Sequence, residues 1–197
     1  KAMNWDRIPF DPASLDLVIV THAHTDHIGL LPRLTKLGYK GPILCTHGTH
    51  GISRISLPDS GRLQEEDARF HNKHRTSSHY PAEPLYTEQD AYACIKQFRA
   101  HKYREIVALP GGASFRFLPA GHILGSAFVE LYFPSGERIL MSGDLGRKDT
   151  PIITDPTQVD FAENLVLEST YGDRLHGDEN ASEKLESILN EAFRDSR

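Results

Sequence analysis

Four residues with metal-binding side chains fall within six positions of the sequence: His22, His24, Asp26 and His27. Neutral imidazoles and carboxylates are ligands that zinc accepts, and three such groups plus a water molecule make an open, catalytic site. Alternate side chains of an extended segment point the same way, so His22 and His24 can share one metal. Asp26 and His27 can then face a second. This spacing predicts a metal site; a polar loop with unrelated histidines is the weaker alternative.

Two later segments carry further candidate ligands, His122 and Asp144. Each follows a predicted strand and has glycine beside it, in the segments AGHILGSA and SGDLGR. A single His or Asp beside glycine is more often a turn residue than a ligand. Loops at several strand ends can nevertheless meet at one edge of a layered fold. We therefore expect both side chains to join the first four.

Alternating strands and helices must position these residues. The apolar run over residues 15–20 predicts a strand that leads into the histidine cluster, and apolar spacing over residues 28–37 predicts a helix after it. Thr87 and Asp90 have capping-box spacing, which predicts a helix over residues 87–98. The fold class is therefore α/β. Further strands are expected at 42–45, 105–109, 114–118, 126–133, 138–141 and 165–167, and further helices within 60–88 and from about residue 180.

Composition narrows the class of protein. The 197 residues are 39% hydrophobic and 25% charged, which suits a globular domain with its own core. No run approaches the roughly 20 apolar residues of a membrane span, so no membrane association is expected. The net charge of −5 argues against a uniformly basic nucleic-acid-binding surface, although bound metal adds local positive charge. Cys45 and Cys94 lack metal or redox spacing, which indicates two reduced thiols in a cytoplasmic protein.

The motifs together resemble the metallo-β-lactamase fold superfamily, through THAHTDH, AGHILGSA and SGDLGR. The continuation ESTYGDR at residues 168–174 is similar to the β-CASP branch of that superfamily, whose members cleave RNA or DNA. This branch includes the nuclease subunit of the cleavage and polyadenylation specificity factor. The resemblance spans residues 10–174. It implies an αββα sandwich, partial here because the family's first strands and its C-terminal return are missing.

The resemblance also implies two zinc ions held by side chains of these motifs, with Asp144 as the bridge between them. Family members carry one more zinc histidine, which follows a β-CASP insertion. No histidine after His122 fits that role, so one metal or partial occupancy is expected in this chain. The remaining implied ligands divide between the first zinc (His22, His24 and His122) and the second (Asp26 and His27).

Catalytic and substrate-binding roles are implied in the same way. Asp26, Asp144 and Glu168 are the implied catalytic residues, and Glu168 would support a histidine general acid that lies outside this chain. Arg147 and Arg174 directly follow site motifs and are the candidate contacts to substrate phosphates.

The expected organisation is an incomplete lactamase-like domain over residues 1–175, followed by a helix over 176–197 that leads toward an absent β-CASP domain. The implied function is a zinc-dependent ribonuclease of RNA processing or decay, which attacks phosphodiesters with metal-bound hydroxide. Its partner is RNA, or else single-stranded DNA. A thioester or lactam hydrolase of the same fold, and a non-catalytic scaffold subunit, are the alternatives. The isolated chain is expected to be inactive, because the family's cleft lies between the two domains.

Overall fold

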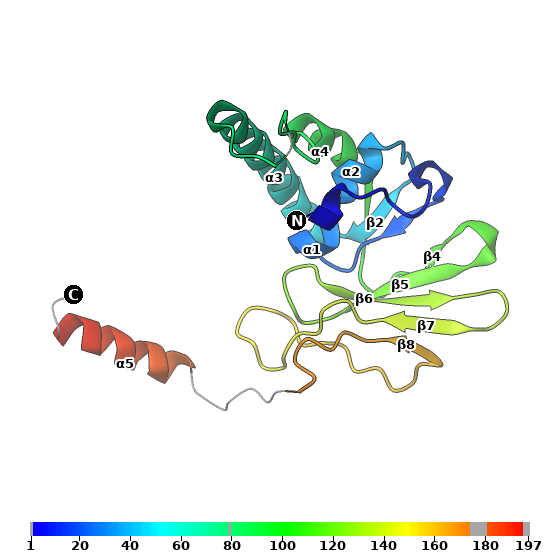
Figure 1. The fold of residues 1–197 in the computed structure, drawn as a ribbon. Helices are drawn as coiled ribbons and strands as arrows, with labels where there is room; N and C mark the ends of the chain where they lie inside the picture. The colour runs from blue at the N-terminus through cyan, green and yellow to red at the C-terminus, as the bar shows by residue number, and fades with distance from the viewer. Residues whose placement is uncertain (1, 79, 174–180, 195–197) are drawn as a thin grey trace.

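The computed structural model describes residues 2–78, 80–173 and 181–194, and it contains two sheets packed face to face (Figure 1). The first sheet is parallel, in the order β1-β2-β3. Helices cover one of its faces, and the second sheet covers the other (Figure 1). The elements of this first half are β1 (Val18–Ile19), α1 (Thr25–Ile28), α2 (Leu31–Lys36), β2 (Ile43–Thr46), α3 (His47–His74), α4 (Glu88–Ile95) and β3 (Phe98–His101).

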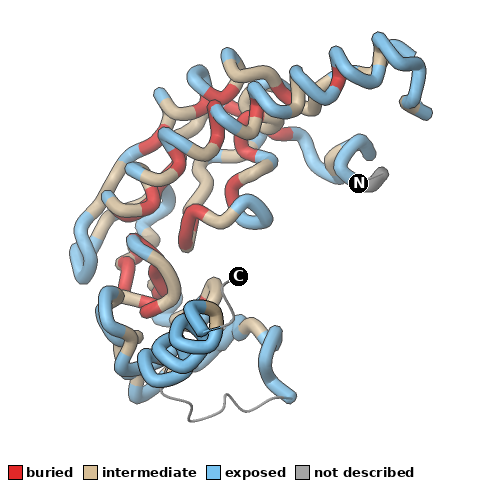
Figure 2. Tube along the Cα trace, turned by 90° about the vertical axis from the view of Figure 1, so that its left-hand side faces the viewer, coloured by how far each residue is buried: buried red, intermediate tan, exposed pale blue. Residues whose placement is uncertain are grey.

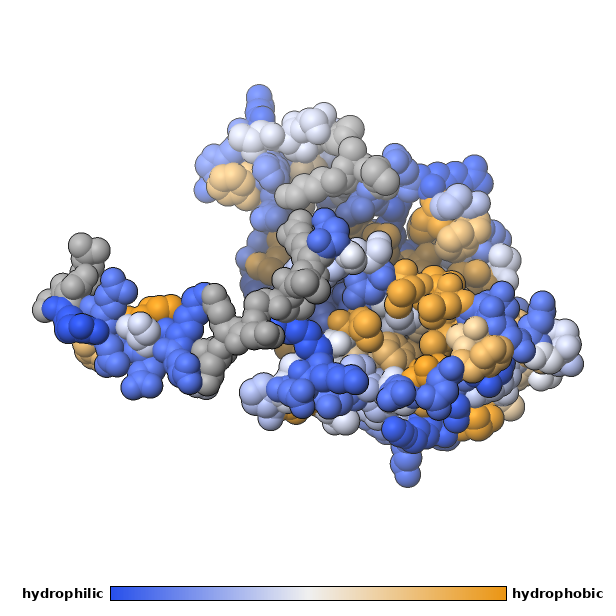
Figure 3. Space-filling view, turned by 90° about the horizontal axis from the view of Figure 1, so that it is seen from below, coloured by the Kyte–Doolittle hydropathy of each residue, from blue (hydrophilic) through white to orange (hydrophobic). Residues whose placement is uncertain are grey.

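The second sheet has the order β4-β5-β6-β7-β8 and is antiparallel except for the last pair. Figure 3 shows apolar side chains gathered on the underside of this sheet. Helix α5 follows after residues 174–180. The elements of this half are β4 (Val107–Ala108), β5 (Ser114–Pro119), β6 (Ala127–Tyr132), β7 (Arg138–Met141), β8 (Asn164–Val166) and α5 (Ala181–Arg194), and short 3₁₀ turns lie at Ala2–Trp5, Pro12–Ser14 and Pro110–Gly112.

The core lies between the layers, where Figure 2 shows the buried segments of the chain. Phe115 and Phe117 on β5 are fully buried and point toward the first sheet, whereas Arg116 between them points outward. They pack with Leu44 of β2 and Val129 of β6. Burying each such side chain contributes about 1.5–3 kcal/mol. The alternation on β5 therefore fixes which of its faces meets the first sheet.

The α/β class is confirmed, and several element boundaries differ from expectation. Helix α3 begins at His47, not near residue 60, because the Thr46 hydroxyl accepts a hydrogen bond from the Thr49 N–H at its N-terminus. The Thr87–Asp90 capping box is present, but α4 ends at Ile95 and the next residues form β3, a strand that was not predicted. The strand expected over residues 15–20 is reduced to the two residues of β1.

No helix among the described residues has both the length and the apolar content needed to cross a lipid bilayer.

Both cysteine thiols are expected to resist modification in the folded protein. Cys45 and Cys94 are fully buried, and burial raises the pKa of Cys45 to about 12 and that of Cys94 to about 11. Because the thiolate is the reactive form, neither residue should be alkylated by iodoacetamide at pH 8. Peptide mass spectrometry should find both unmodified before unfolding in guanidinium and both modified afterwards. Rapid labelling of the native protein would contradict this packing.

Candidate metal centre

Four side chains from three loops converge at one edge of the two sheets. His22 and His24 follow β1, His122 follows β5, and Asp144 follows β7. The His24 Nδ1 atom lies 3.1 Å from His22 Nε2 and 3.0 Å from His122 Nε2. The Asp144 Oδ2 atom lies 3.5 Å from His22 Nε2 and 3.4 Å from His122 Nε2. All four donor atoms lie within 4.8 Å of one another.

The spacing of these donor atoms suits a divalent metal ion. Ligands placed tetrahedrally at about 2.1 Å from zinc are about 3.4 Å apart, and the four contacts here measure 3.0, 3.1, 3.4 and 3.5 Å. Hydrogen bonding alone does not explain why His22 Nε2 and His122 Nε2 both face His24 Nδ1, because that nitrogen has at most one lone pair to accept an N–H. The donor set therefore fits a metal ion better than a polar cluster that satisfies itself.

Asp26 and His27 lie in the first turn of α1, on the other side of Asp144. His27 Nε2 is 3.2 Å from Asp144 Oδ1 and 3.5 Å from Asp26 Oδ2. Asp144 thus presents one carboxylate oxygen to each donor set, which is the arrangement that a bridging ligand requires. The Asp26 side chain is 77% exposed, whereas that of His22 is fully buried. The second set is therefore the more open of the two.

Backbone contacts hold the three loops together. The Ala127 N–H donates to the Thr21 carbonyl oxygen at 2.9 Å, which ties the start of β6 to the histidine-bearing segment. The Gly146 N–H donates to the Ala120 carbonyl oxygen at 2.8 Å. A Cβ at Gly146 would overlap the Gly121 carbonyl oxygen, so the two loops can approach this closely only with glycine at position 146.

Burial favours the neutral form of two histidines of the cluster, His22 and His122. Desolvation, followed by the charge of the adjacent His27, lowers the pKa of His22 to about 4. The pKa of His122 is also lowered, chiefly by desolvation, although the charge of Asp144 opposes this shift. Neutral rings at pH 7 have a lone pair to offer a metal. Thr21 Oγ1 lies 3.1 Å from His22 Nδ1 and is the partner for the ring nitrogen that faces away from the cluster.

Glu168 lies beside this centre and joins two loops. Its Oε1 accepts the Leu145 N–H at 2.8 Å, and its Oε2 accepts the Thr170 N–H at 3.1 Å. The Leu145 N–H, followed by the Thr170 contacts, lowers the pKa of Glu168. The structure therefore shows a charged carboxylate that links the segment after β7 to the segment after β8.

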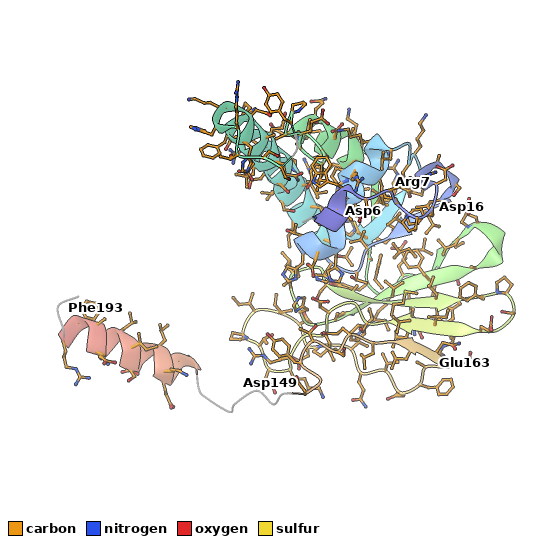
Figure 4. The ribbon with its side chains drawn as sticks, in the orientation of Figure 1. Asp6, Arg7, Asp16, Asp149, Glu163 and Phe193 are labelled. Atoms are coloured by element: carbon orange, nitrogen blue, oxygen red, sulfur yellow. The ribbon has the colours of Figure 1, made fainter. Side chains whose placement is uncertain are left out.

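Of the two arginines expected to contact substrate, only Arg147 lies in the part of the chain that the structure describes. Arg147 is exposed and lines a hollow next to His122 and Asp144. Arg174 lies outside the described residues. Figure 4 shows Asp149, from the same loop as Arg147, and Glu163 at opposite ends of the second sheet. Asp144 follows β7 and Glu163 precedes the parallel strand β8, so the candidate centre lies at the end opposite Glu163.

Buried hydroxyl groups that support the centre were missed by sequence reasoning. Ser126 Oγ accepts the backbone N–H of His122 at 3.0 Å and that of the next residue at 3.2 Å. Thr46 and Thr49 both donate to the Gly125 carbonyl oxygen, at 2.6 and 3.0 Å. Of these three residues, only Ser126 lies in a motif, AGHILGSA, and its Gly-Ser pair by itself indicates a turn. These contacts fix the loop that carries His122.

Comparison with known proteins gives one family match and several relatives. A family model described as the metallo-beta-lactamase superfamily matches residues 4–186. The chain is 34% identical over 176 residues to Ribonuclease TTHA0252 of Thermus thermophilus, covering 89% of this chain and 36% of that protein. It is 30% identical over 194 residues to the transcription termination factor FttA of Methanocaldococcus jannaschii, covering 95% and 28%.

The chain thus spans about a third of the length of these curated relatives. Among solved structures, a metallo-β-lactamase with a HARLDQ motif from Cronobacter sakazakii overlaps 74% of this chain and 47% of its own, with a TM-score of 0.43 and 16% identity.

Proposed function

Because this chain belongs to the metallo-β-lactamase superfamily, we propose that it is the metal-binding part of a cytoplasmic, zinc-dependent ribonuclease of the β-CASP branch. Residues 1–175 are the lactamase-like domain in this proposal, and residues 176–197 lead away from it. The observation that carries the proposal is the convergence of three imidazole nitrogens and a carboxylate oxygen within 4.8 Å.

In this proposal His22, His24 and His122 would hold one zinc ion, Asp26 and His27 would hold a second, and Asp144 would be shared by both. When bound, such ions lower the pKa of water to about 7 and neutralise charge on a phosphoryl oxygen. The protein must supply neutral imidazoles, and burial provides them at His22 and His122. It must also orient a bridging carboxylate, and Asp144 faces both donor sets.

RNA is the proposed substrate because the relatives that match this chain over most of its length are named as a ribonuclease and as transcription termination factors. Three residues of the ESTYGDR segment that resembles the β-CASP branch, Glu168, Thr170 and Tyr171, line the hollow beside the centre. Arg147 adds a cation next to the centre, where a phosphodiester anion would lie. A thioester or lactam hydrolase would use the same metal ligands, so the choice of RNA rests on the relatives and on the segment that contains Glu168. A non-catalytic scaffold would not require a converging ligand set.

The proposal is tested with the intact protein that contains this chain, on labelled single-stranded RNA, single-stranded DNA, a chromogenic thioester and a lactam. RNA cleavage that stops after treatment with a chelator and returns with zinc supports it. Turnover of the thioester or lactam alone would replace it with the first alternative. Absence of bound metal after zinc supplementation would favour the scaffold alternative.

Removing the Ser126 hydroxyl is expected to weaken zinc binding. Ser126→Ala leaves two buried backbone N–H groups without an acceptor, one of them that of His122, so the ring loses its fixed position. Loss of such a supporting contact typically lowers metal affinity about 10–100-fold. Competition with a zinc-chelating dye measures the change. The exposed Ser135→Ala is the matched control and should bind zinc normally; equal affinities in the two variants would show that Ser126 does not position His122.

A further inference from the structure

We propose that the hollow beside the metal centre holds a single nucleotide adjacent to the scissile phosphate, with its base stacked on Tyr171. This inference rests on the proposed ribonuclease function and adds a specific binding subsite to it. The hollow has a volume of about 320 Å³, which lies at the lower end of small-ligand pockets at about 300–1,000 Å³. It suits one nucleotide unit rather than a duplex.

The position of the hollow links it to the reaction centre. His122 and Asp144, two members of the converging donor set, line it. A phosphodiester bound at those donors would extend its neighbouring ribose and base into the adjacent open space. The rest of the lining includes Leu145, Arg147 and Thr150 from the segment after β7, and Thr170 and Tyr171 from the segment after β8.

Hydrogen bonds give the hollow a fixed shape. The Glu168 carboxylate binds the N–H of Leu145 in one wall and that of Thr170 in the other. The first wall is further tied to the His122 loop by the Gly146 N–H and is braced by the Thr150 hydroxyl, which donates to the Ile153 carbonyl oxygen at 3.1 Å. A subsite of fixed shape loses little entropy when a ligand binds.

The chemistry of the lining suits a nucleotide. Tyr171 is 56% exposed and Leu145 46% exposed, so an aromatic and an aliphatic surface face solvent at the mouth. Every base has a π-face that can stack on an aromatic ring, and this gives binding without sequence preference. Within the described part of the chain, no carboxylate forms an ion pair with Arg147. Because Arg147 is exposed and lines the hollow, we assign its guanidinium to the next phosphate of the bound strand.

The test uses the intact protein. First, the zinc-loaded enzyme cleaves a short single-stranded RNA, and the position of the cleaved bond is mapped. Binding is then measured by fluorescence anisotropy on metal-free protein, with that RNA and with copies carrying one abasic nucleotide on either side of the bond. Variants are Tyr171→Ala, Tyr171→Phe and Arg147→Ala. Tyr92→Ala, an exposed tyrosine on α4, is the matched control.

Tyr171→Ala should weaken binding of the normal RNA about 5- to 150-fold, the range that corresponds to about 1–3 kcal/mol per stacked base. Tyr171→Phe should change it less than about twofold, because a phenyl ring still stacks. Tyr92→Ala should also change it less than about twofold, because Tyr92 does not line the hollow. One of the two abasic RNAs should bind the wild-type protein as weakly as the normal RNA binds Tyr171→Ala. Binding of that abasic RNA to Tyr171→Ala should be no weaker than either change alone produces. Arg147→Ala should reduce the slope of the logarithm of the binding constant against the logarithm of the salt concentration. The reduction should be about the contribution of one phosphate contact.

Additive effects of Tyr171→Ala and both abasic substitutions would overturn the subsite, as would unaltered or unmeasurable RNA binding throughout. If the zinc-loaded wild-type protein cleaves RNA while these results appear, only the subsite is wrong. If it cleaves no RNA at all, the proposed function fails instead.

Discussion

Asp144→Ala in the intact protein is expected to abolish RNA cleavage and to remove most of the bound metal. Asp144 is the one residue whose two carboxylate oxygens face both donor sets, at 3.4–3.5 Å from His22 and His122 and at 3.2 Å from His27. Its loss would remove a ligand from each proposed zinc ion and the negative charge that offsets theirs. Metal ions supply several kcal/mol of charge stabilisation, so kcat/KM should fall by at least about 10³-fold.

Metal content by mass spectrometry and RNA cleavage by gel assay measure both parts of this prediction. Asp16→Ala is a suitable control, because Asp16 is exposed and precedes β1, far from the centre (Figure 4). Its metal content and activity should match those of the wild type. If Asp144→Ala retained both metals and cleaved RNA normally, the carboxylate would have no role in the site.

Glu168→Gln is expected to reduce RNA cleavage about 10–100-fold while zinc content stays unchanged. A carboxylate can accept the Leu145 and Thr170 N–H groups with separate oxygens, but an amide would turn its own NH₂ group toward one of these donors. The loops that carry Asp144 and Tyr171 would then separate. Glu163→Gln, at the opposite end of the second sheet, is the control and should not affect cleavage (Figure 4).

The pH dependence distinguishes this positioning role from proton transfer. The pKa of Glu168 is lowered in the folded protein, so its carboxylate is charged at every pH above its ordinary value, and its contribution to stability disappears only as the pH falls through the folded pKa. The pH–rate profile between pH 6 and 8 should therefore have the same shape in the wild type and in Glu168→Gln. If the rate of the wild type falls toward acid pH in this range and that of Glu168→Gln does not, Glu168 would instead be a proton donor or acceptor.

The ligand-type residues of the candidate site were largely predictable, because each is identified by its neighbours in the sequence. His22 and His24 share a direction in any extended segment, and His122 and Asp144 each follow a strand that residue alternation identifies. The sequence did not show how closely the three loops approach, which depends on Gly146 and on the hydrogen bond from Ala127 to Thr21. These are contacts between residues far apart in the chain.

Two features of the fold could not be predicted, for identifiable physical reasons. The first turns of α3 contain Gly48 and Gly51, and Pro58 lies inside the helix, so local propensity opposes a helix that packing nevertheless stabilises. Gly48 lies against Gly125, where a Cβ would be 2.7 Å from the Gly125 Cα. Strand β3 was hidden because Phe98 continues the apolar spacing of α4, although it pairs with Ile43 of β2.

The supporting hydroxyls show the same limit for the site. Ser126 is only 2% exposed and binds two backbone N–H groups, yet serine is common in turns and carries no signature of burial. Thr46 and Thr49 act across 79 and 76 residues of sequence on the Gly125 carbonyl oxygen. Sequence patterns identify groups that could bind a metal. The residues that hold those groups in place become visible only when the chain is folded.

Crystals of the intact protein grown with zinc, with diffraction data collected on both sides of the zinc absorption edge, test metal binding most directly. The account predicts an anomalous peak bonded to His22 Nε2, His24 Nδ1, His122 Nε2 and Asp144 Oδ2. A structure with zinc in excess and no peak at this point, or with His122 or Asp144 turned away from it, would contradict the account.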